Sequence, residues 1–170
     1  MFRLWMALAA AGMIGLDQLT KWWAVSALAE KTIVLIPGVF ELHLTYNTGA
    51  AFSMMEGETW LLILLPALVS LVMLTVLFSG KWRQYVLINI GGLMLASGGI
   101  GNLIDRIAAG KVTDFLYFKL IDFPIFNVAD CFVTVGCVLA GIAVIFFDRW
   151  VLFEDNKKDK TKISGEKNDK

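Results

Sequence analysis

Four aspartates that lie in or beside apolar stretches are the residues of this sequence best suited to chemistry. Asp17 lies inside one apolar stretch, and Asp105, Asp114 and Asp130 lie near the ends of two others. A carboxylate at membrane depth costs about 2.5–3.5 kcal/mol on insertion scales, so such groups usually serve a function. Because all four fall on one predicted side of a bilayer, we expect them to form a functional site there.

Two carboxylates placed close together can carry out hydrolysis. They share a proton and titrate as a pair, so that one activates water while the other protonates a leaving group, as in aspartyl proteolysis. A proton or ion relay is a commoner use of acids in membranes, and a non-catalytic scaffold is a third possibility. A relay needs polar groups across the whole bilayer, but two of the apolar runs offer only Ser70, Thr75 and Thr134. The clustering at one face therefore favours chemistry at the interface.

The sequence contains few residues that could bind a metal ion or act as a nucleophile in a catalytic triad. His43 is the only histidine, so neither a histidine metal cluster nor a Ser-His-Asp triad can be assembled. Cys131 and Cys137 are six residues apart and do not share a helix face, which makes a disulfide or a metal pair a poor interpretation. We therefore expect no metal site and no cofactor.

Residues at helical spacing accompany two of the aspartates. Asp17 and Lys21 are four apart, so they are neighbours on one helix face. An ion pair between them is at least as good an interpretation as catalysis, and we expect a supporting role. Asn127 and Asp130 are three apart at the start of a span and face the same way, although the helix dipole alone also favours an acid there.

Amide and guanidinium donors lie close to the same side of the bilayer. Asn102 and Arg106 are four apart beside Asp105, and their fixed donors suit substrate backbone or lipid carbonyls. An ion pair between Asp105 and Arg106 is the alternative. Asn47 and Gly49 begin a run of small residues in which the backbone either approaches a ligand closely or makes an ordinary turn.

The composition is that of an integral membrane protein. Of the 170 residues, 58% are hydrophobic and 18% charged, and the mean hydropathy is +0.69. The net charge is zero, which does not support nucleic-acid binding. A spanning helix needs about 20 residues, and suitable runs cover residues 4–25, 60–78, 85–104 and 127–147. We expect a mainly α-helical membrane catalytic domain with four transmembrane helices over residues 1–154, followed by a disordered tail over residues 155–170.

The placement of lysine and arginine predicts the orientation of these spans. Four spans put both termini on one side, which then holds ten of the fifteen Lys and Arg residues. The positive-inside rule makes that side cytoplasmic and puts the aspartates at the extracytoplasmic face. Residues 1–29 also have features of a cleaved signal peptide, but Asp17 and Lys21 interrupt the apolar run, so we favour a retained span.

The segments between the spans differ in character. Residues 32–40 and 41–46 are rich in β-branched and aromatic side chains, with Pro37-Gly38 as a turn between them, and predict a small β-rich element on the outer surface. Residues 106–126 are also apolar, and we expect them to form an interfacial loop or helix. Asp114 would lie there in extended or irregular structure, where a solvated loop acid is the simpler interpretation.

Five short motifs occur in an order that closely resembles the lipoprotein signal peptidase (signal peptidase II) family. They are Asp17-Gln18-Leu19-Thr20-Lys21, Asn47-Thr48-Gly49-Ala50-Ala51-Phe52, Gly101-Asn102-Leu103-Ile104-Asp105-Arg106, Val112-Thr113-Asp114-Phe115 and Phe126-Asn127-Val128-Ala129-Asp130. One motif alone would be weak, but five in order are specific. The sequence departs from the family pattern at Cys131, where serine is common, and at Gly99, where alanine is frequent.

The resemblance implies an aspartyl endopeptidase of the bacterial cytoplasmic (inner) membrane. Such enzymes remove the signal peptide from prolipoproteins by cutting before the diacylglyceryl-modified cysteine. It implies that Asp114 and Asp130 are the catalytic pair. The residues it implies for substrate binding and positioning are Asn47, Gly49, Asn102, Arg106 and Asn127, and those for support are Asp17, Lys21 and Asp105. It further implies sensitivity to globomycin-type peptides, contact with membrane lipid, and neither metal nor cofactor.

Two more expectations follow from the resemblance. One chain contains every piece of the implied site, so we expect a monomer. We also expect the run of residues 47–53 to form a lid or floor for the lipid-bearing residue of the substrate.

Overall fold

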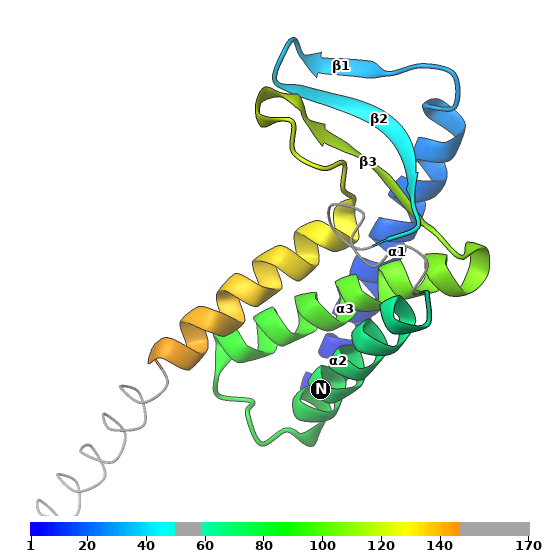
Figure 1. Cartoon of the computed structure of the whole chain (residues 1–170). Coiled ribbons are helices and arrows are strands. Elements are labelled where there is room, and N and C mark those ends of the chain that lie inside the picture. The colour runs from blue at the N-terminus through cyan, green and yellow to red at the C-terminus, as the bar shows by residue number, and fades with distance from the viewer. Residues whose placement is uncertain (50–58, 147–170) are drawn as a thin grey trace, which may run out of the picture.

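The protein consists of long helices that carry a small sheet at one end (Figure 1). The computed structural model describes residues 1–49 and 59–146. Its elements in chain order are α1 (Phe2–Ala27), β1 (Ile33–Ile36), β2 (Phe40–Asn47), α2 (Thr59–Ser79), α3 (Val86–Ala109), β3 (Val112–Phe118), the 3₁₀ helix η2 (Lys119–Ile121) and a final helix, Val128–Phe146. The prediction of a mainly helical protein with a small β element is therefore confirmed.

Among the described residues, three helices are long and apolar enough to cross a membrane. They are Trp60–Ser79 within α2, Val86–Ala109 and Val128–Phe146. α1 has sufficient length, 26 residues, but it contains Asp17, Gln18 and Lys21, which make it less apolar. Three of the four predicted spans thus correspond to helices that could cross a membrane, and the span predicted over residues 4–25 remains a prediction.

α1 turns Asp17 and Lys21 toward the protein interior, while Arg3 near its N-terminus is exposed. Asp17, Lys21 and Ala24 are its buried residues, whereas apolar side chains such as Leu16 and Trp22 are exposed. An amphipathic helix of a soluble protein shows the opposite arrangement. Ionisable residues within membrane helices face the interior of the bundle, so this arrangement suits a helix with lipid around it.

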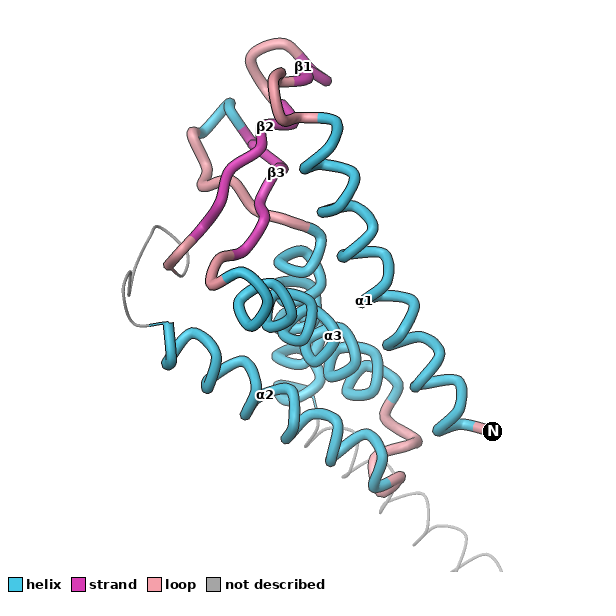
Figure 2. The backbone as a smooth tube through the Cα atoms, turned by 90° about the vertical axis from the view of Figure 1, so that its right-hand side faces the viewer, coloured by secondary structure: helices cyan, strands magenta, loops and turns pink. Residues whose placement is uncertain are grey.

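α3 is the central helix and packs against both α1 and α2 (Figure 2). Glycines permit its close contacts. A Cβ on Gly136 of the final helix would lie 2.7 Å from the backbone N of Leu95 and 2.8 Å from the backbone O of Gly91. A Cβ on Gly101 would lie 2.6 Å from Asp17 Oδ2. Glycine at this position therefore makes room for a buried carboxylate of α1.

The sheet has the strand order β1-β2-β3, with antiparallel pairing at both steps. β1 and β2 form an antiparallel pair within the predicted β-rich element, and the turn between them includes Gly38, whose φ of +72° glycine adopts without strain. The expectation of an interfacial loop or helix is wrong for β3. The run from Phe115 to Phe118 is apolar throughout, and a run without alternation does not distinguish a strand from other apolar structure.

The C-terminal end of α1 anchors the sheet. Ala24 of α1 and Leu28, which directly follows α1, form one buried cluster with Leu42 of β2 and Phe115 of β3. Because Phe115 directly follows Asp114 in the chain, this packing also fixes the backbone that carries Asp114. The position of that carboxyl therefore depends on contacts between segments far apart in sequence.

Candidate active site

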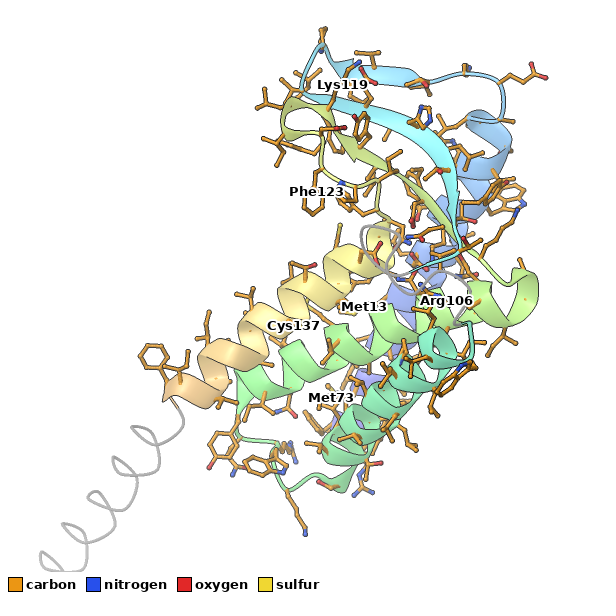
Figure 3. The ribbon with its side chains drawn as sticks, in the orientation of Figure 1. Met13, Met73, Arg106, Lys119, Phe123 and Cys137 are labelled. Atoms are coloured by element: carbon orange, nitrogen blue, oxygen red, sulfur yellow. The ribbon has the colours of Figure 1, made fainter. Side chains whose placement is uncertain are left out.

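A cavity of about 480 Å³ lies where the sheet meets α3 and the start of the final helix. Its polar side chains are Asn47, Asn102, Arg106, Asp114 and Asp130, together with Thr134. Cys131 and the apolar residues 123–126, Val112 and Val133 line the remainder. Figure 3 labels Arg106 on α3 and Phe123 on the segment after η2. The structure thus brings both aspartates of the expected pair to one cavity, along with three of the expected positioning residues.

Asp130 is held in the first turn of the final helix by reciprocal contacts with Asn127. The backbone N–H of Asp130 donates to Asn127 Oδ1 at 3.0 Å, and the backbone N–H of Asn127 donates to Asp130 Oδ2 at 3.1 Å. This arrangement is a capping box. Asn102 Nδ2 donates to the other oxygen, Asp130 Oδ1, at 2.7 Å. Both carboxylate oxygens of Asp130 therefore have a fixed position.

Asp114 lies on β3 and is only 2% exposed. Asn127 Nδ2 donates to Asp114 Oδ1 at 2.6 Å, and the side chain of Asn47 forms a second hydrogen bond with this carboxyl. Burial, and then the negative charge of Asp130, raise the pKa of the Asp114 carboxyl from its usual 3.8 to about 6. Asp114 therefore keeps a proton to higher pH than an exposed aspartate, as a general acid must.

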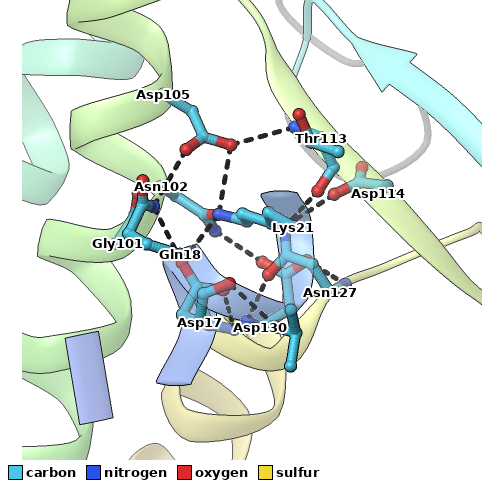
Figure 4. Close-up of polar contacts among 12 residues, drawn as sticks. Asp17, Gln18, Lys21, Gly101, Asn102, Asp105, Thr113, Asp114, Asn127 and Asp130 are labelled. Atoms are coloured by element: carbon cyan, nitrogen blue, oxygen red, sulfur yellow. Dashed lines mark hydrogen bonds and ion pairs between the residues drawn. The ribbon is translucent and has the colours of Figure 1, made fainter. Parts of the chain in front are cut away.

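Asn127 connects the two aspartates (Figure 4). It is fully buried, at 0% exposure. Its amide nitrogen donates to Asp114 and also to Asn102 Oδ1, at 3.0 Å, while its backbone and its amide oxygen contact Asp130. The two aspartates and two asparagines form one hydrogen-bonded unit, so a change of charge on one carboxyl is felt by the other.

A buried ionic cluster lies beside this unit. Lys21 Nζ is 2.9 Å from Asp17 Oδ2 and 3.2 Å from Asp105 Oδ2, so the ion pair considered for Asp17 and Lys21 is present. Lys21 Nζ also donates to Asn102 Oδ1 at 2.9 Å. Asp17 Oδ1 accepts the backbone N–H of Ala129 at 2.9 Å. The cluster therefore joins α1 to α3 and to the start of the final helix.

Two contributors to this cluster were not among the expected site residues. Gln18 Nε2 donates to Asp17 Oδ2 at 3.1 Å and to Asp105 Oδ1 at 3.0 Å. The backbone N–H of Thr113 donates to Asp105 Oδ2 at 3.0 Å, which ties β3 to α3 one residue before Asp114. A glutamine beside an acid in an apolar stretch is a signal that could have identified Gln18. A backbone donor such as that of Thr113 leaves no signal in sequence.

Arg106 lines the cavity and contacts the segment that follows β2. Its Nη2 donates to the backbone O of Gly49 at 2.9 Å, and the backbone N–H of Gly49 donates to Asn47 Oδ1 at 2.9 Å. The carboxylate of Asp105, the alternative partner of Arg106, contacts Lys21 instead. Residues 50–53 lie outside the described residues, and with them most of the run expected to form a lid or floor.

Within residues 1–49 and 59–146, no three His, Cys, Asp or Glu side chains are grouped so as to hold a metal ion. Cys131 and Cys137 are free thiols, and Cys131 lines the cavity next to Asp130. The described side chains therefore offer this cavity two carboxyl groups, surrounded by amide and guanidinium donors.

Replacing Asp114 by asparagine should stabilise the protein at neutral pH. Because folding raises the pKa of Asp114 to about 6, its contribution to stability is greatest below about pH 4 and falls by up to about 3 kcal/mol as the pH rises to about 6. Asparagine does not titrate and accepts the same hydrogen bond. We expect the difference in unfolding free energy between Asp114→Asn and wild type to grow over this range in favour of the variant. Unfolding in detergent at a series of pH values measures it, and parallel curves would contradict it.

Comparison with known proteins identifies the same family that the five sequence motifs resemble. A family model described as signal peptidase (SPase) II matches residues 9–146. A lipoprotein signal peptidase of Gloeobacter violaceus is 43% identical over 144 residues, which cover 81% of this chain and 80% of that protein. Another, from Clostridioides difficile, is 39% identical over 137 residues, covering 80% and 91%. The solved structure of a bacterial membrane enzyme is similar with a TM-score of 0.73 and 28% identity, over 82% of this chain and 87% of that chain.

Proposed function

Because the chain belongs to the signal peptidase II family, we propose that it removes signal peptides from bacterial prolipoproteins by an aspartyl mechanism. The bond before the diacylglyceryl-modified cysteine is hydrolysed by Asp114 and Asp130. One observation carries the mechanism: Asn127 contacts both carboxyls at a single cavity, at 2.6 Å from Asp114 and 3.1 Å from Asp130.

The two carboxyls supply complementary proton transfers. One carboxylate removes a proton from water, whose oxygen attacks the carbonyl carbon of the scissile bond. The other carboxyl gives its proton to the carbonyl oxygen, which yields a neutral tetrahedral intermediate. As the C–N bond breaks, the first carboxyl protonates the departing nitrogen and the second takes a proton back from a hydroxyl of the intermediate. The pair then returns to its starting state with one shared proton.

The other polar residues of the region hold the reacting groups in place. The residues that position the substrate and the two carboxyls are Asn47, Gly49, Asn102, Arg106 and Asn127. The residues that support them are Asp17, Lys21 and Asp105. What supports this division is contact: the first set lines or adjoins the cavity, whereas the second joins α1 to α3 through buried ion pairs.

The substrate and the site meet at the membrane boundary in this proposal. α1 completes the set of four membrane-spanning helices, since its exposed face is apolar and its charged residues near the site are buried. Both termini are cytoplasmic, and the cavity lies at the extracytoplasmic face of the bacterial inner membrane. A signal-peptide helix leaves the hydrocarbon there, while its diacylglyceryl group remains in lipid. Residues 1–154 act as a monomeric catalytic domain and residues 155–170 as a cytoplasmic tail.

A precursor assay tests this function. Purified protein in lipid nanodiscs is incubated with a lipoprotein precursor that carries diacylglyceryl cysteine, and separately with the same precursor before lipid attachment. We expect cleavage of the lipidated form alone, directly before the modified cysteine, and inhibition by a globomycin-type peptide. Mass spectrometry of the products identifies the bond. Cleavage of neither precursor, or of both at the same rate, would contradict the proposal.

A further inference from the structure

Lys21 is a buried cation that reaches the aspartate pair through one side-chain amide. It is 3% exposed, and its Nζ donates to Asn102 Oδ1 at 2.9 Å. An ammonium group only donates, so the amide oxygen of Asn102 must face it. Asn127 Nδ2 donates to the same oxygen at 3.0 Å. The amide nitrogen of Asn102 is therefore turned toward Asp130, to which it donates at 2.7 Å.

The surroundings of the two aspartates favour different forms. Asp130 accepts the Asn102 amide and the backbone N–H of Asn127, and it lies in the first turn of a helix, where the dipole favours negative charge. Asp114 lies on a strand, which has no comparable dipole. Burial, and then the charge of Asp130, raise the pKa of Asp114 to about 6. Asp130 is thus better placed to be ionised, and Asp114 to hold the shared proton.

We propose that Lys21 is a positioning residue that acts through Asn102 to keep Asp130 ionised as the base while Asp114 carries the proton. This inference rests on the proposed function and assigns a role to each carboxyl. The other titratable groups around the pair are Asp17, Asp105, Arg106 and Cys131. With both carboxyls of the pair ionised, four aspartates would face only two cations, Lys21 and Arg106, so the charge of Lys21 affects the ionisation of both.

The pH dependence of cleavage separates this role from a structural one. Wild-type kcat/KM should have a bell-shaped dependence on pH. It should rise as Asp130 loses its proton and fall as Asp114 loses its proton. Lys21→Met removes a positive charge near both carboxyls, which makes each harder to ionise. Both limbs should therefore move to higher pH by about one unit, which lowers kcat/KM about tenfold at a fixed pH on the acidic limb. Lys21→Arg keeps the charge and should keep both limbs near their wild-type positions.

Matched variants serve as controls. Lys119→Met removes a lysine whose partner is Glu41 on the sheet, at 2.7 Å, and should leave both limbs unmoved. If Lys21→Met does not fold, Lys21→Gln takes its place, because it keeps an amide donor toward Asn102 without the charge, and it should give the same upward movement. If the variants that remove the charge of Lys21 had lower activity but no movement of either limb, the inference would be overturned.

Two further measurements show which of the proposals is wrong if the expected results are not obtained. The fall in unfolding free energy between about pH 4 and 6 should be smaller in Asp114→Asn than in Asp130→Asn, and the reverse would overturn the assignment of the proton. A wild-type protein that does not cleave the lipidated precursor would overturn the proposed function. Wild-type cleavage with unmoved limbs in the Lys21 variants would overturn only the role of Lys21.

Discussion

Asp114→Asn and Asp130→Asn should each lower the rate of precursor cleavage about a thousandfold without unfolding the protein. Proton transfer by a positioned side chain contributes about 10²–10⁴-fold to a reaction rate, and each carboxyl is one half of the pair. Asparagine has nearly the same size and retains an oxygen that accepts the amide of Asn127 at position 114 and the amide of Asn102 at position 130. The variants therefore lose the proton chemistry while one hydrogen bond to an asparagine amide is kept at each position.

Initial rates with the lipidated precursor measure this effect, and tryptophan fluorescence during unfolding shows that each variant is folded. Asp122→Asn is the matched control, because Asp122 is exposed and its φ of +49° is one that asparagine tolerates. It should cleave at the wild-type rate. A variant of Asp114 or Asp130 that retained a rate within about tenfold of wild type would exclude the proposed aspartyl mechanism.

The apolar helices were predictable because a bilayer constrains both length and polarity. α2, Thr59–Ser79, lies within one residue of the predicted run 60–78 at each end. α3 continues to Ala109, past the predicted end at residue 104. Hydropathy ends this span at Asp105, but the side chain of Asp105 is only 10% exposed and pairs with Lys21 inside the protein. A polar residue that has a buried partner does not end a helix.

The third strand of the sheet was not predictable from its pattern. Phe115 lies in one buried cluster with Ala24 of α1 and with Leu28 just after it, and the residues that follow Phe115 are also apolar. A strand that contacts other elements on both faces loses the alternation by which strands are recognised. Asp114 belongs to this strand. Its motif identified it as a candidate site residue, but its burial and its hydrogen-bond partners depend on tertiary packing and could not be predicted.

The connections of the site were less predictable than its members. Spacing within one helix indicates neighbours three or four residues apart, which was sufficient for Asp17 and Lys21. The contact from Lys21 to Asn102 spans 81 residues of sequence, and that from Ala129 to Asp17 spans 112. Such contacts require three helices to meet closely, which depends on glycines such as Gly101 whose significance appears only in the packed structure.

Asp17→Ala should destabilise the protein by about 3–5 kcal/mol, because it removes one partner of a buried ion pair and leaves the other charge poorly compensated. Asp17 is fully buried and contacts Lys21 Nζ at 2.9 Å and Gln18 Nε2 at 3.1 Å. It also accepts the backbone N–H of Ala129 at 2.9 Å. That N–H belongs to the first turn of the final helix and has no partner within the helix itself, so the substitution would leave it unpaired as well.

Free energies of unfolding in detergent measure this loss, and a double variant identifies its cause. Asp17→Ala combined with Lys21→Met should be less destabilised than the sum of the two single variants, since both single variants break the same buried ion pair. Glu41→Ala is the comparison, because its partner Lys119 is 49% exposed and stays solvated, so the loss of that ion pair should amount to about 1 kcal/mol or less. If the double variant lost as much as the two single variants together, the stability supplied by Asp17 would come from its contact with Ala129 and not from the charge of Lys21.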